Sequence, residues 1–502
     1  MPLKSRWQVN VPDTHLASLL FTSPFHPLSK THRCFSEAAN ADTRYFTTHD
    51  FRLWSQRFAA GLRKSGLQTG DRVLLFSGND LFFPVVLMGI IMAGGIFSGA
   101  NPTFVARELA YQLQDSGATY LLCADSSLDT GIEAAKMAGM GQDRVFVFNG
   151  AIYEGSGQGQ KGCRYWGDLV ASEEEGSKFA WEELSTPEAS NRTLALNYSS
   201  GTTGKPKGVE ITHKNYVANT LQYNAMFYLN PDHKAKAARA RWLCFLPMYH
   251  AMAQNIFIAC ALSRGVPVYF MPKFDFIKVL EYTEKFRITD LILVPPVVIA
   301  LAKHPAVRSG KYDLSSVETI GSGAAPLGRE VCQEVEALWE PGRINIKQGW
   351  GMTEYDFFCF LPFPSFFFCA SPRVLTRICR TTCSLLGWNP TEKSNSASVG
   401  ELNANCEAKI IGDDGSTELG RNQRGELWVR GQNVMKGYWR NPRATQETKT
   451  PDGWLKTGDI AYVDDNGKFH VVDRKKVRIL CSAAKNRSGD ICNSPREDST
   501  VC

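Results

Sequence analysis

Apolar residues in the first quarter of the chain switch between a helical spacing and short continuous runs. A helical apolar face begins after Thr47 and ends at Gly66, with Thr48 or Asp50 as its N-cap. Because strands that alternate with helices form parallel, doubly wound sheets, we expect an α/β fold. No Gly-x-Gly-x-x-Gly follows the first strand, which disfavours an NAD-type dinucleotide fold. The runs predict strands over 71–76, 96–99 and 118–123 and helices over 81–94 and 107–116.

The longest uncharged segment runs over residues 81–106, which is long enough for a membrane span. Pro84 lies near its start, and Gly94 and Gly95 interrupt it before the full span is reached. We therefore expect a buried helix followed by a short strand, and no membrane span.

A glycine-rich stretch at residues 198–210 reads Tyr-Ser-Ser-Gly-Thr-Thr-Gly-Lys-Pro-Lys-Gly-Val-Glu. Glycines allow a close backbone approach to a ligand, and hydroxyls, free N–H groups and lysines suit a polyphosphate. Strands are expected over 194–198 and 208–212, and a helix over 214–228 begins only after the N-cap candidate Thr212. A Walker A loop runs directly into a helix, so this strand–loop–strand unit is a different kind of phosphate loop.

Two later stretches carry candidates for binding the rest of a nucleotide. A strand that opens into the small residues 323–325 leaves a flat surface against which a planar base can lie. Residues 346–354 then read Ile-Lys-Gln-Gly-Trp-Gly-Met-Thr-Glu. In this motif Trp350 can stack on adenine, Thr353 can bond a phosphate, and Glu354 can hold Mg²⁺ through oxygen.

Taken together, these motifs resemble those of the adenylate-forming enzymes, which include acyl-CoA synthetases, 4-coumarate–CoA ligases, beetle luciferases and peptide-synthetase adenylation domains. The resemblance runs from about Phe35 to about Lys476 with one interruption. It implies a large AMP-binding domain over 35–472, made of stacked doubly wound sheets with a small β-barrel-like subdomain. Residues 1–34 are then an irregular N-terminus, and 473–502 are the hinge and a remnant of a mobile C-terminal domain.

The resemblance also implies roles for individual residues. Asp459 would accept hydrogen bonds from both ribose hydroxyls, and Lys273 would contact coenzyme A. The implied ATP- or AMP-binding residues are Ser199, Ser200, Gly201, Thr202, Thr203, Gly204, Lys207, Gly323, Ala324, Ala325, Gln348, Gly349, Trp350, Gly351, Met352, Thr353, Asp459 and Arg474. The implied catalytic residues are His250, Thr353, Glu354 and Arg474, with Glu354 also the magnesium ligand, and the implied acyl-binding residues are His250, Met252, Ala253, Ile256 and Gly323.

Two segments depart from the family pattern. Residues 355–380 are inserted directly after Glu354, against the expected adenine and magnesium site. Their composition is typical of a translated intron, and the alternative is a genuine apolar lid. Residues 477–502 show no helix or strand pattern, and no position matches the family lysine that bridges the carboxylate and the α-phosphate. We therefore expect most of the mobile domain to be missing and ligase activity to be impaired.

The function implied by the resemblance is an ATP-dependent acyl-CoA ligase that uses Mg²⁺ and coenzyme A. It would activate a small-molecule carboxylic acid through an acyl-adenylate, and both an arylpropenoic acid and a medium-chain fatty acid fit the apolar lining. The alternatives are an enzyme that loads an acyl group on a carrier protein, a luciferase, and a non-catalytic truncated product. The sequence carries no signature of oligomeric state.

Composition adds constraints on partners and location. A net charge of +6 over 502 residues, with no basic run interleaved with aromatics, disfavours nucleic acid as a partner. The 14 cysteines include no Cys-x-x-Cys pair, so reduced thiols are expected. The N-terminus lacks a signal peptide, and the final Thr-Val-Cys is not a peroxisomal address. We expect a cytoplasmic protein, and a peroxisomal one only with a targeting tripeptide at a different C-terminus.

Overall fold

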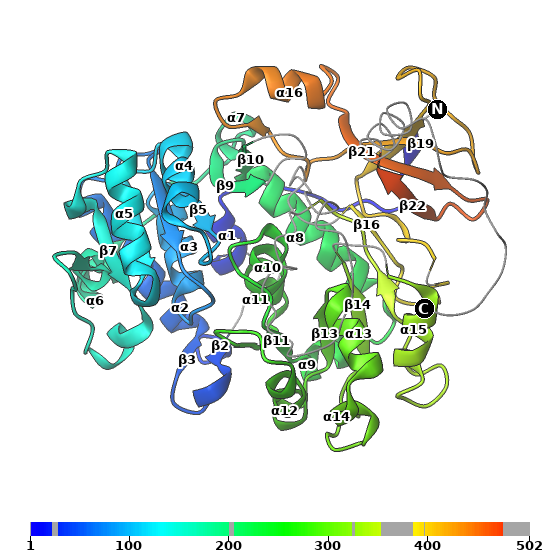
Figure 1. The fold of residues 1–502 in the computed structure, drawn as a ribbon, viewed down its shortest axis with the longest axis horizontal. Coiled ribbons are helices and arrows are strands. Elements are labelled where there is room, and N and C mark those ends of the chain that lie inside the picture. The colour runs from blue at the N-terminus through cyan, green and yellow to red at the C-terminus, as the bar shows by residue number, and fades with distance from the viewer. Residues whose placement is uncertain are drawn as a thin grey trace, which may run out of the picture.

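The computed structural model describes residues 2–22, 29–199, 205–323, 327–352, 385–395 and 397–474, and within these ranges the strands form four sheets. The first sheet occupies the blue and cyan part of Figure 1, and it is parallel from β9 through β5, β4 and β6 to β8. The β10 and β20 edge is antiparallel, so the expected doubly wound sheet is confirmed with a mixed edge. Its strands in spatial order are β20 (Gly437–Tyr438), β10 (Lys207–Thr212), β9 (Thr193–Ser199), β5 (Ile96–Ala100), β4 (Arg72–Phe76), β6 (Tyr120–Ala124), β7 (Val145–Phe148) and β8 (Arg164–Tyr165).

Helices α2 (Thr48–Lys64) and α3 (Phe83–Met92) pack against each other beside this sheet. The N-cap of α2 is Thr47, one residue before the expected position, because Asp50 completes a reciprocal capping box with it. Every residue of α3 is buried, as its uninterrupted apolar sequence predicts. Along the part of the chain that is described, no helix is long and apolar enough to cross a bilayer.

The second sheet lies mostly in the green part of Figure 1, with β2 and β3 in blue, and it is parallel from β15 to β2, with β3 antiparallel at its edge. Parallel pairing brings the carboxyl ends of β14 and β15 to one edge, which is where ligands bind in open α/β sheets. Its strands in spatial order are β15 (Lys347–Gln348), β14 (Thr319–Ser322), β13 (Asp290–Leu293), β11 (Trp242–Cys244), β12 (Val268–Phe270), β2 (Arg33–Glu37) and β3 (Tyr45–Thr47). Flanking helices include α8 (His213–Tyr228), α12 (Phe276–Phe286), α13 (Pro295–Lys303) and α15 (Arg329–Glu336).

The third sheet is a five-stranded antiparallel half-barrel, drawn mainly in yellow, orange and red in Figure 1. The first 34 residues, expected to be irregular, supply its edge strand β1, and they also form α1 (Leu16–Phe21), whose Leu16 and Leu20 are buried. In spatial order its strands are β1 (Leu3–Lys4), β18 (Glu407–Ile411), β19 (Gly425–Arg430), β21 (Leu455–Val463) and β22 (Phe469–Arg474).

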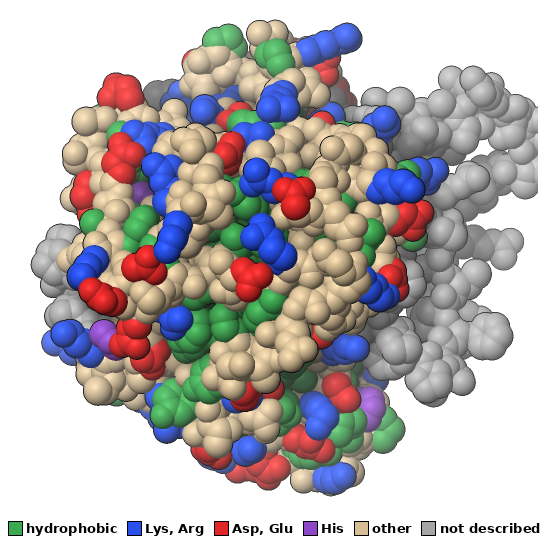
Figure 2. Space-filling view, turned by 90° about the vertical axis from the view of Figure 1, so that its left-hand side faces the viewer, with side chains coloured by type: hydrophobic (Ala, Val, Ile, Leu, Met, Phe, Trp, Pro, Cys, Tyr) green, Lys and Arg blue, Asp and Glu red, His purple; other side chains and the backbone are tan. Residues whose placement is uncertain are grey.

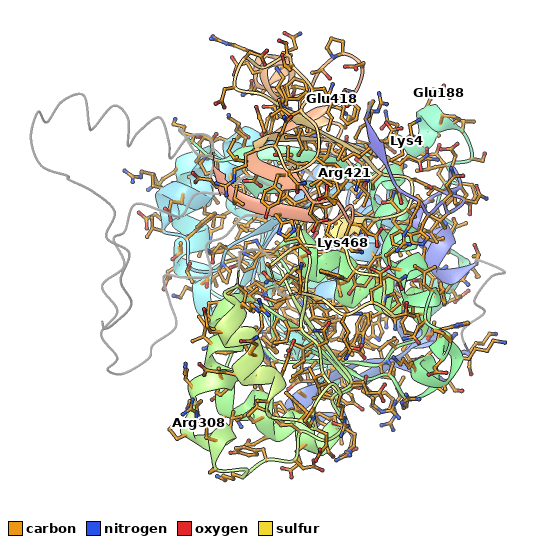
Figure 3. The ribbon with its side chains drawn as sticks, turned by 90° about the vertical axis from the view of Figure 1, so that its right-hand side faces the viewer. Lys4, Glu188, Arg308, Glu418, Arg421 and Lys468 are labelled. Atoms are coloured by element: carbon orange, nitrogen blue, oxygen red, sulfur yellow. The ribbon has the colours of Figure 1, made fainter. Side chains whose placement is uncertain are left out.

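An ion-pair network ties the N-terminal segment to the half-barrel. Lys468, labelled in Figure 3, donates to Glu401 at 2.8 Å and to Glu392, and Arg6 pairs with the same two carboxylates. Burial alone would lower the pKa of Lys468, but these hydrogen bonds raise it above its ordinary value. The lysine is therefore held charged between the two acids.

Charged side chains on the face over the first sheet are mixed in sign. Figure 2 shows Lys and Arg interspersed with Asp and Glu there, without an area of one sign. The inserted residues 355–380 and the C-terminal residues 477–502 lie outside the described residues, so the expectations for them stay predictions.

Candidate active site

The glycine-rich hairpin forms as the sequence predicts. Strands β9 and β10 pair antiparallel, and Lys207 lies opposite Ser199. Helix α8 begins only after β10, where the Thr212 hydroxyl caps the Asn215 N–H. The hairpin context, strand then loop then strand, is therefore confirmed.

The base of this hairpin is fixed to helix α4 (Ala106–Ser116) by two tyrosines. The Tyr198 hydroxyl donates to Asp115 Oδ2 at 2.6 Å, and the Tyr111 hydroxyl donates to the carbonyl of Pro206 at 2.7 Å. Burial raises the pKa of Tyr111 to about 12, so its hydroxyl remains a donor. In addition, Lys207 Nζ lies 5.3 Å from the Tyr438 ring centroid. Both ends of the loop are thus held in place before any ligand binds.

The Gln-Gly-Trp-Gly motif starts on β15 and is held by its own amide. Gln348 donates to the carbonyl of Leu327 and accepts from the Leu327 N–H, both at 3.0 Å. The Gly349 N–H donates to the carbonyl of Ser322 at 2.9 Å. These bonds bring the motif beside the end of β14, where Gly323 begins the small-residue turn.

Trp350 connects this motif to the half-barrel. Its indole Nε1 donates to Asp459 Oδ2 at 3.0 Å, and both side chains are buried. Asp459 lies on β21, more than a hundred residues along the chain. The structure therefore brings together the aromatic residue expected at adenine and the carboxylate expected at ribose.

A cavity of about 430 Å³ is lined both by residues expected at the acyl group and by residues expected at adenine. The wall of this cavity, called here the central cavity, is formed by α8, by the helical segment after His250, by β11, β13 and β14, and by the Gln-Gly-Trp-Gly motif. A Cβ placed on Gly323 would lie 3.6 Å from the Met252 sulfur, so these two acyl candidates face each other. Of the predicted residues, Met252, Ile256, Gly323, Gln348, Gly349, Trp350 and Gly351 line it.

His250 precedes the helix that carries Met252 and Ile256. Its Nε2 is buried and has no hydrogen-bond partner among the described residues. Burial lowers the pKa of His250 to about 4, so its ring is neutral near pH 7. A neutral imidazole with an unoccupied nitrogen can hydrogen-bond a carboxylate or water, but it supplies no positive charge.

Other predicted residues lie elsewhere or outside the described chain. Lys273 is exposed and does not line the central cavity. Ala253 follows Met252 on α10 (Ala251–Ala253), and its side chain is buried in the core. The sites that lie outside the described residues are Ser200, Gly201, Thr202, Thr203, Gly204, Ala324, Ala325, Thr353 and Glu354, and the side chains of Ser199 and Arg474 are likewise outside.

Sequence reasoning missed several lining residues, among them Phe227, Trp242 and Arg264. Arg264 ends a helical run that carries no other charged residue, and this single cation was the available signal. Within the described ranges, no group of three or more His, Cys, Asp or Glu side chains is placed to hold a metal ion. The magnesium assignment to Glu354 stays a prediction.

Comparisons with known proteins agree with this arrangement. The chain is 33% identical to 4-coumarate–CoA ligase 1 of Petroselinum crispum over 466 residues, which is 91% of this chain and 76% of that protein. It is 34% identical to 4-coumarate–CoA ligase 2 of Solanum tuberosum over 447 residues, which is 88% of this chain and 72% of the other.

Solved structures share the fold. A long-chain-fatty-acid–CoA ligase of Archaeoglobus fulgidus superposes with a TM-score of 0.75 at 20% identity, covering 96% of this chain and 88% of that one. A luciferase-like enzyme of the mealworm Zophobas morio superposes with a TM-score of 0.74 at 22% identity, covering 95% and 99%. The family model described as AMP-binding enzyme matches residues 29–439. This chain therefore belongs to the family of AMP-binding enzymes.

Proposed function

We propose that the chain is an AMP-forming acid–CoA ligase, which activates a carboxylic acid with ATP and transfers the acyl group to coenzyme A. The observation that carries the proposal is the shared cavity. Met252 and Ile256, expected at the acyl group, and Trp350, expected at adenine, line one space. A single acyl-adenylate would occupy it.

The reaction proceeds in two displacements. An oxygen of the substrate carboxylate attacks the α-phosphorus of ATP, and the bond to the β-phosphate oxygen breaks to release pyrophosphate. The sulfur of coenzyme A, as its thiolate, then attacks the acyl carbon, and AMP leaves with the carboxylate-derived oxygen. Both steps depend on positioning and on neutralising phosphate charge.

Residues of this chain have distinct roles in the proposal. Trp350 would stack on adenine. Asp459 would accept hydrogen bonds from the ribose hydroxyls, either in place of its hydrogen bond from the indole N–H or in addition to it. The hydroxyls and N–H groups of residues 199–204, together with Lys207, would hold the phosphates. Neutral His250 would orient the substrate carboxylate by a hydrogen bond. Glu354 would hold Mg²⁺, which supplies charge neutralisation at the phosphates, and Arg474 would contact the ribose and phosphate side.

The substrate class and the location of the protein are part of the proposal. The apolar side chains of Met252 and Ile256 suit an aromatic or a fatty acid. The similar P. crispum protein is named for an aromatic acid, and the similar A. fulgidus protein is named for long-chain fatty acids. Lys273, being exposed, would meet coenzyme A from outside the cavity. We place the nucleotide-binding domain at 35–472 and the protein in the cytoplasm.

The test is turnover by the purified 502-residue chain. With ATP, Mg²⁺, coenzyme A and a panel of aromatic and fatty acids, AMP should appear only when an acid is present, and acyl-CoA should accumulate with it. Acyl-adenylate formation without acylation of coenzyme A would favour a carrier-protein loading enzyme. An inability to bind ATP or AMP would overturn the proposal.

A further inference from the structure

The central cavity extends well beyond the expected reaction centre. It follows one face of the seven-stranded sheet from Gly323, after the carboxyl end of β14, to Thr319 at the start of that strand. Four residue steps of a strand correspond to about 13 Å. Trp242 and Asp290, paired in register at the amino ends of β11 and β13, line the far end.

One helical segment lines the cavity along this whole length. It consists of α10, the π-helical turns Gln254–Cys260 and α11 (Ala261–Arg264), and it packs on α8, as Figure 1 shows. Met252 and Ile256 lie near the reaction centre, and Arg264 is its last residue. The chain then returns through Gly265 toward the amino end of β12, so Arg264 belongs to the far end.

Arg264 is partly buried there, and no carboxylate among the described residues forms an ion pair with it. Its guanidinium carbon lies 3.5 Å from the centroid of the Phe227 ring and 5.0 Å from that of Trp242. Its Nε and Nη2 are buried and make no hydrogen bond to any described residue. Burial lowers the pKa of Arg264, and the charge of Asp290 opposes that shift in part. Buried donor nitrogens are normally paired, so these two atoms remain available to a ligand.

The neighbouring groups define what that ligand must offer. Trp242 Nε1 is also buried without a partner among the described residues, and arginine and tryptophan side chains only donate. Asp290 accepts the Thr289 hydroxyl at 2.6 Å. It acts on Arg264 through its charge, and no hydrogen bond between the two side chains occurs among the described residues. Glu318 is already paired with Arg239. Because Arg264 and Trp242 offer unpaired donors at the far end, this end suits a ligand group that accepts hydrogen bonds.

We propose that Arg264 binds a second carboxylate, and that the preferred substrate is an extended α,ω-dicarboxylic acid. This inference rests on the proposed ligase function. One carboxylate would be activated near Gly323 and Trp350, the methylene chain would contact Met252 and Ile256, and the other carboxylate would accept from Arg264 and Trp242. Paired hydrogen bonds from one guanidinium to a carboxylate are strong and specific. A methyl end would leave the guanidinium unpaired.

The kinetic test compares dicarboxylates from adipate to sebacate with monocarboxylates of the same chain length. The 502-residue chain should show kcat/KM for its best dicarboxylate at least about tenfold above the matched monocarboxylate. Arg264→Met, which keeps the length and removes the charge, should reverse this order, and Arg264→Lys should retain part of it. Arg308→Met, at the periphery of the molecule in Figure 3, is the matched control and should change neither value.

A binding measurement separates this proposal from the proposed function. Equilibrium dialysis of suberate with AMP present should show binding to the unsubstituted chain and loss of binding in Arg264→Met, whether or not turnover is detected. Thermal unfolding should show Arg264→Met folded, since it removes a partly buried charge. Equal suberate binding by both chains, or a preference of the unsubstituted chain for monocarboxylates, would overturn the assignment of Arg264. Absence of turnover with every acid would count against the proposed ligase function and not against the assignment of Arg264.

Discussion

Trp350 donates its indole N–H to Asp459 across the boundary between the second sheet and the half-barrel, at 3.0 Å. The Trp350 backbone also pairs with Leu386, so the motif is held from two sides. A hydrogen bond to a buried carboxylate is stronger than one between neutral groups. This contact therefore links the stability of the half-barrel to the geometry of the proposed adenine site.

We predict that Trp350→Phe destabilises the fold, because phenylalanine keeps an aromatic ring but lacks the N–H that donates to Asp459. The expected loss is about 2 kcal/mol in the free energy of unfolding, measured by urea denaturation. ATP affinity should fall less than in Trp350→Ala, since the phenyl ring can still stack.

Trp428→Phe is the matched control for that substitution. Trp428 is as buried as Trp350, each 8% exposed, but its Nε1 has no hydrogen-bond partner among the described residues. The control should lose distinctly less stability. Equal losses in the two variants would show that the Asp459 contact contributes nothing particular.

A second prediction concerns Gly321, which lines the central cavity in the middle of β14. A Cβ there would meet no atom within 4 Å, so Gly321→Val should fold with little change in melting temperature. Its branched side chain would instead narrow the cavity. We expect kcat/KM to fall by about tenfold or more for long acids and far less for short ones.

The control is Gly420→Val, at a glycine where the nearest foreign atom, from the Gln423 side chain, is 3.6 Å away. It lies outside the central cavity and should leave acid selectivity unchanged. If Gly321→Val turned over long and short acids in the original ratio, the cavity would not be the acyl site.

The third prediction follows from the neutral state of His250. Burial lowers its pKa from 6.5 to about 4, so the ring gains a proton only below the range in which enzymes are usually assayed. From about pH 5 to about pH 8 its protonation does not change. His250→Asn should therefore lower kcat/KM while leaving the shape of the pH profile intact. An acidic limb near the ordinary histidine pKa that disappears in the variant would contradict this role.

The fourth prediction concerns acid stability and two buried histidines that do not line the central cavity. The His15 and His213 rings have centroids 4.3 Å apart, and burial lowers the pKa of His15 from 6.5 to about 4 and that of His213 well below its ordinary value. Because the folded pKa lies below the unfolded one, stability is intact above about pH 6.5 and is lost as the pH falls toward 4. For His15 alone the loss approaches about 3 kcal/mol.

Unfolding by urea as a function of pH measures this loss. His15→Asn keeps an oxygen that can cap the Ala17 N–H, as His15 Nδ1 does, and it removes one titrating ring. Its stability should fall less steeply with acid. His49→Gln changes an exposed histidine and should leave the slope unaltered. A slope unchanged in His15→Asn would mean that the buried pair does not govern acid unfolding.

The features that the sequence predicts well depend on local chemistry. The hairpin around the glycine-rich loop and the cap at Thr212 follow from neighbouring residues alone, and both are confirmed. The buried helix α3 follows from its uninterrupted apolar run. Even the shift of the α2 cap to Thr47 is local, since it is decided by Asp50 three residues later.

The features that the sequence does not predict depend on partners far along the chain. Strand β1 forms because Leu3 pairs with Ala408 on β18, and nothing in the first 34 residues specifies that pairing. Likewise Arg264 has the sequence pattern of an ordinary helix-terminal cation, and only folding brings its guanidinium against the rings of Phe227 and Trp242. The contact of Trp350 with Asp459 is of the same kind, although the family resemblance anticipates that both serve one nucleotide.

The most direct test of the account is the titration of a hydrolysis-resistant acyl-adenylate analogue, an acyl sulfamoyl-adenosine, into the 502-residue chain. If one cavity holds both the acyl group and the adenosine, the analogue should bind at a single site about a hundredfold more tightly than AMP. AMP and the free acid should each displace the analogue. Asp459→Asn and Met252→Trp should each weaken its binding. Binding no tighter than AMP, or AMP and acid that fail to compete with the analogue, would contradict the account.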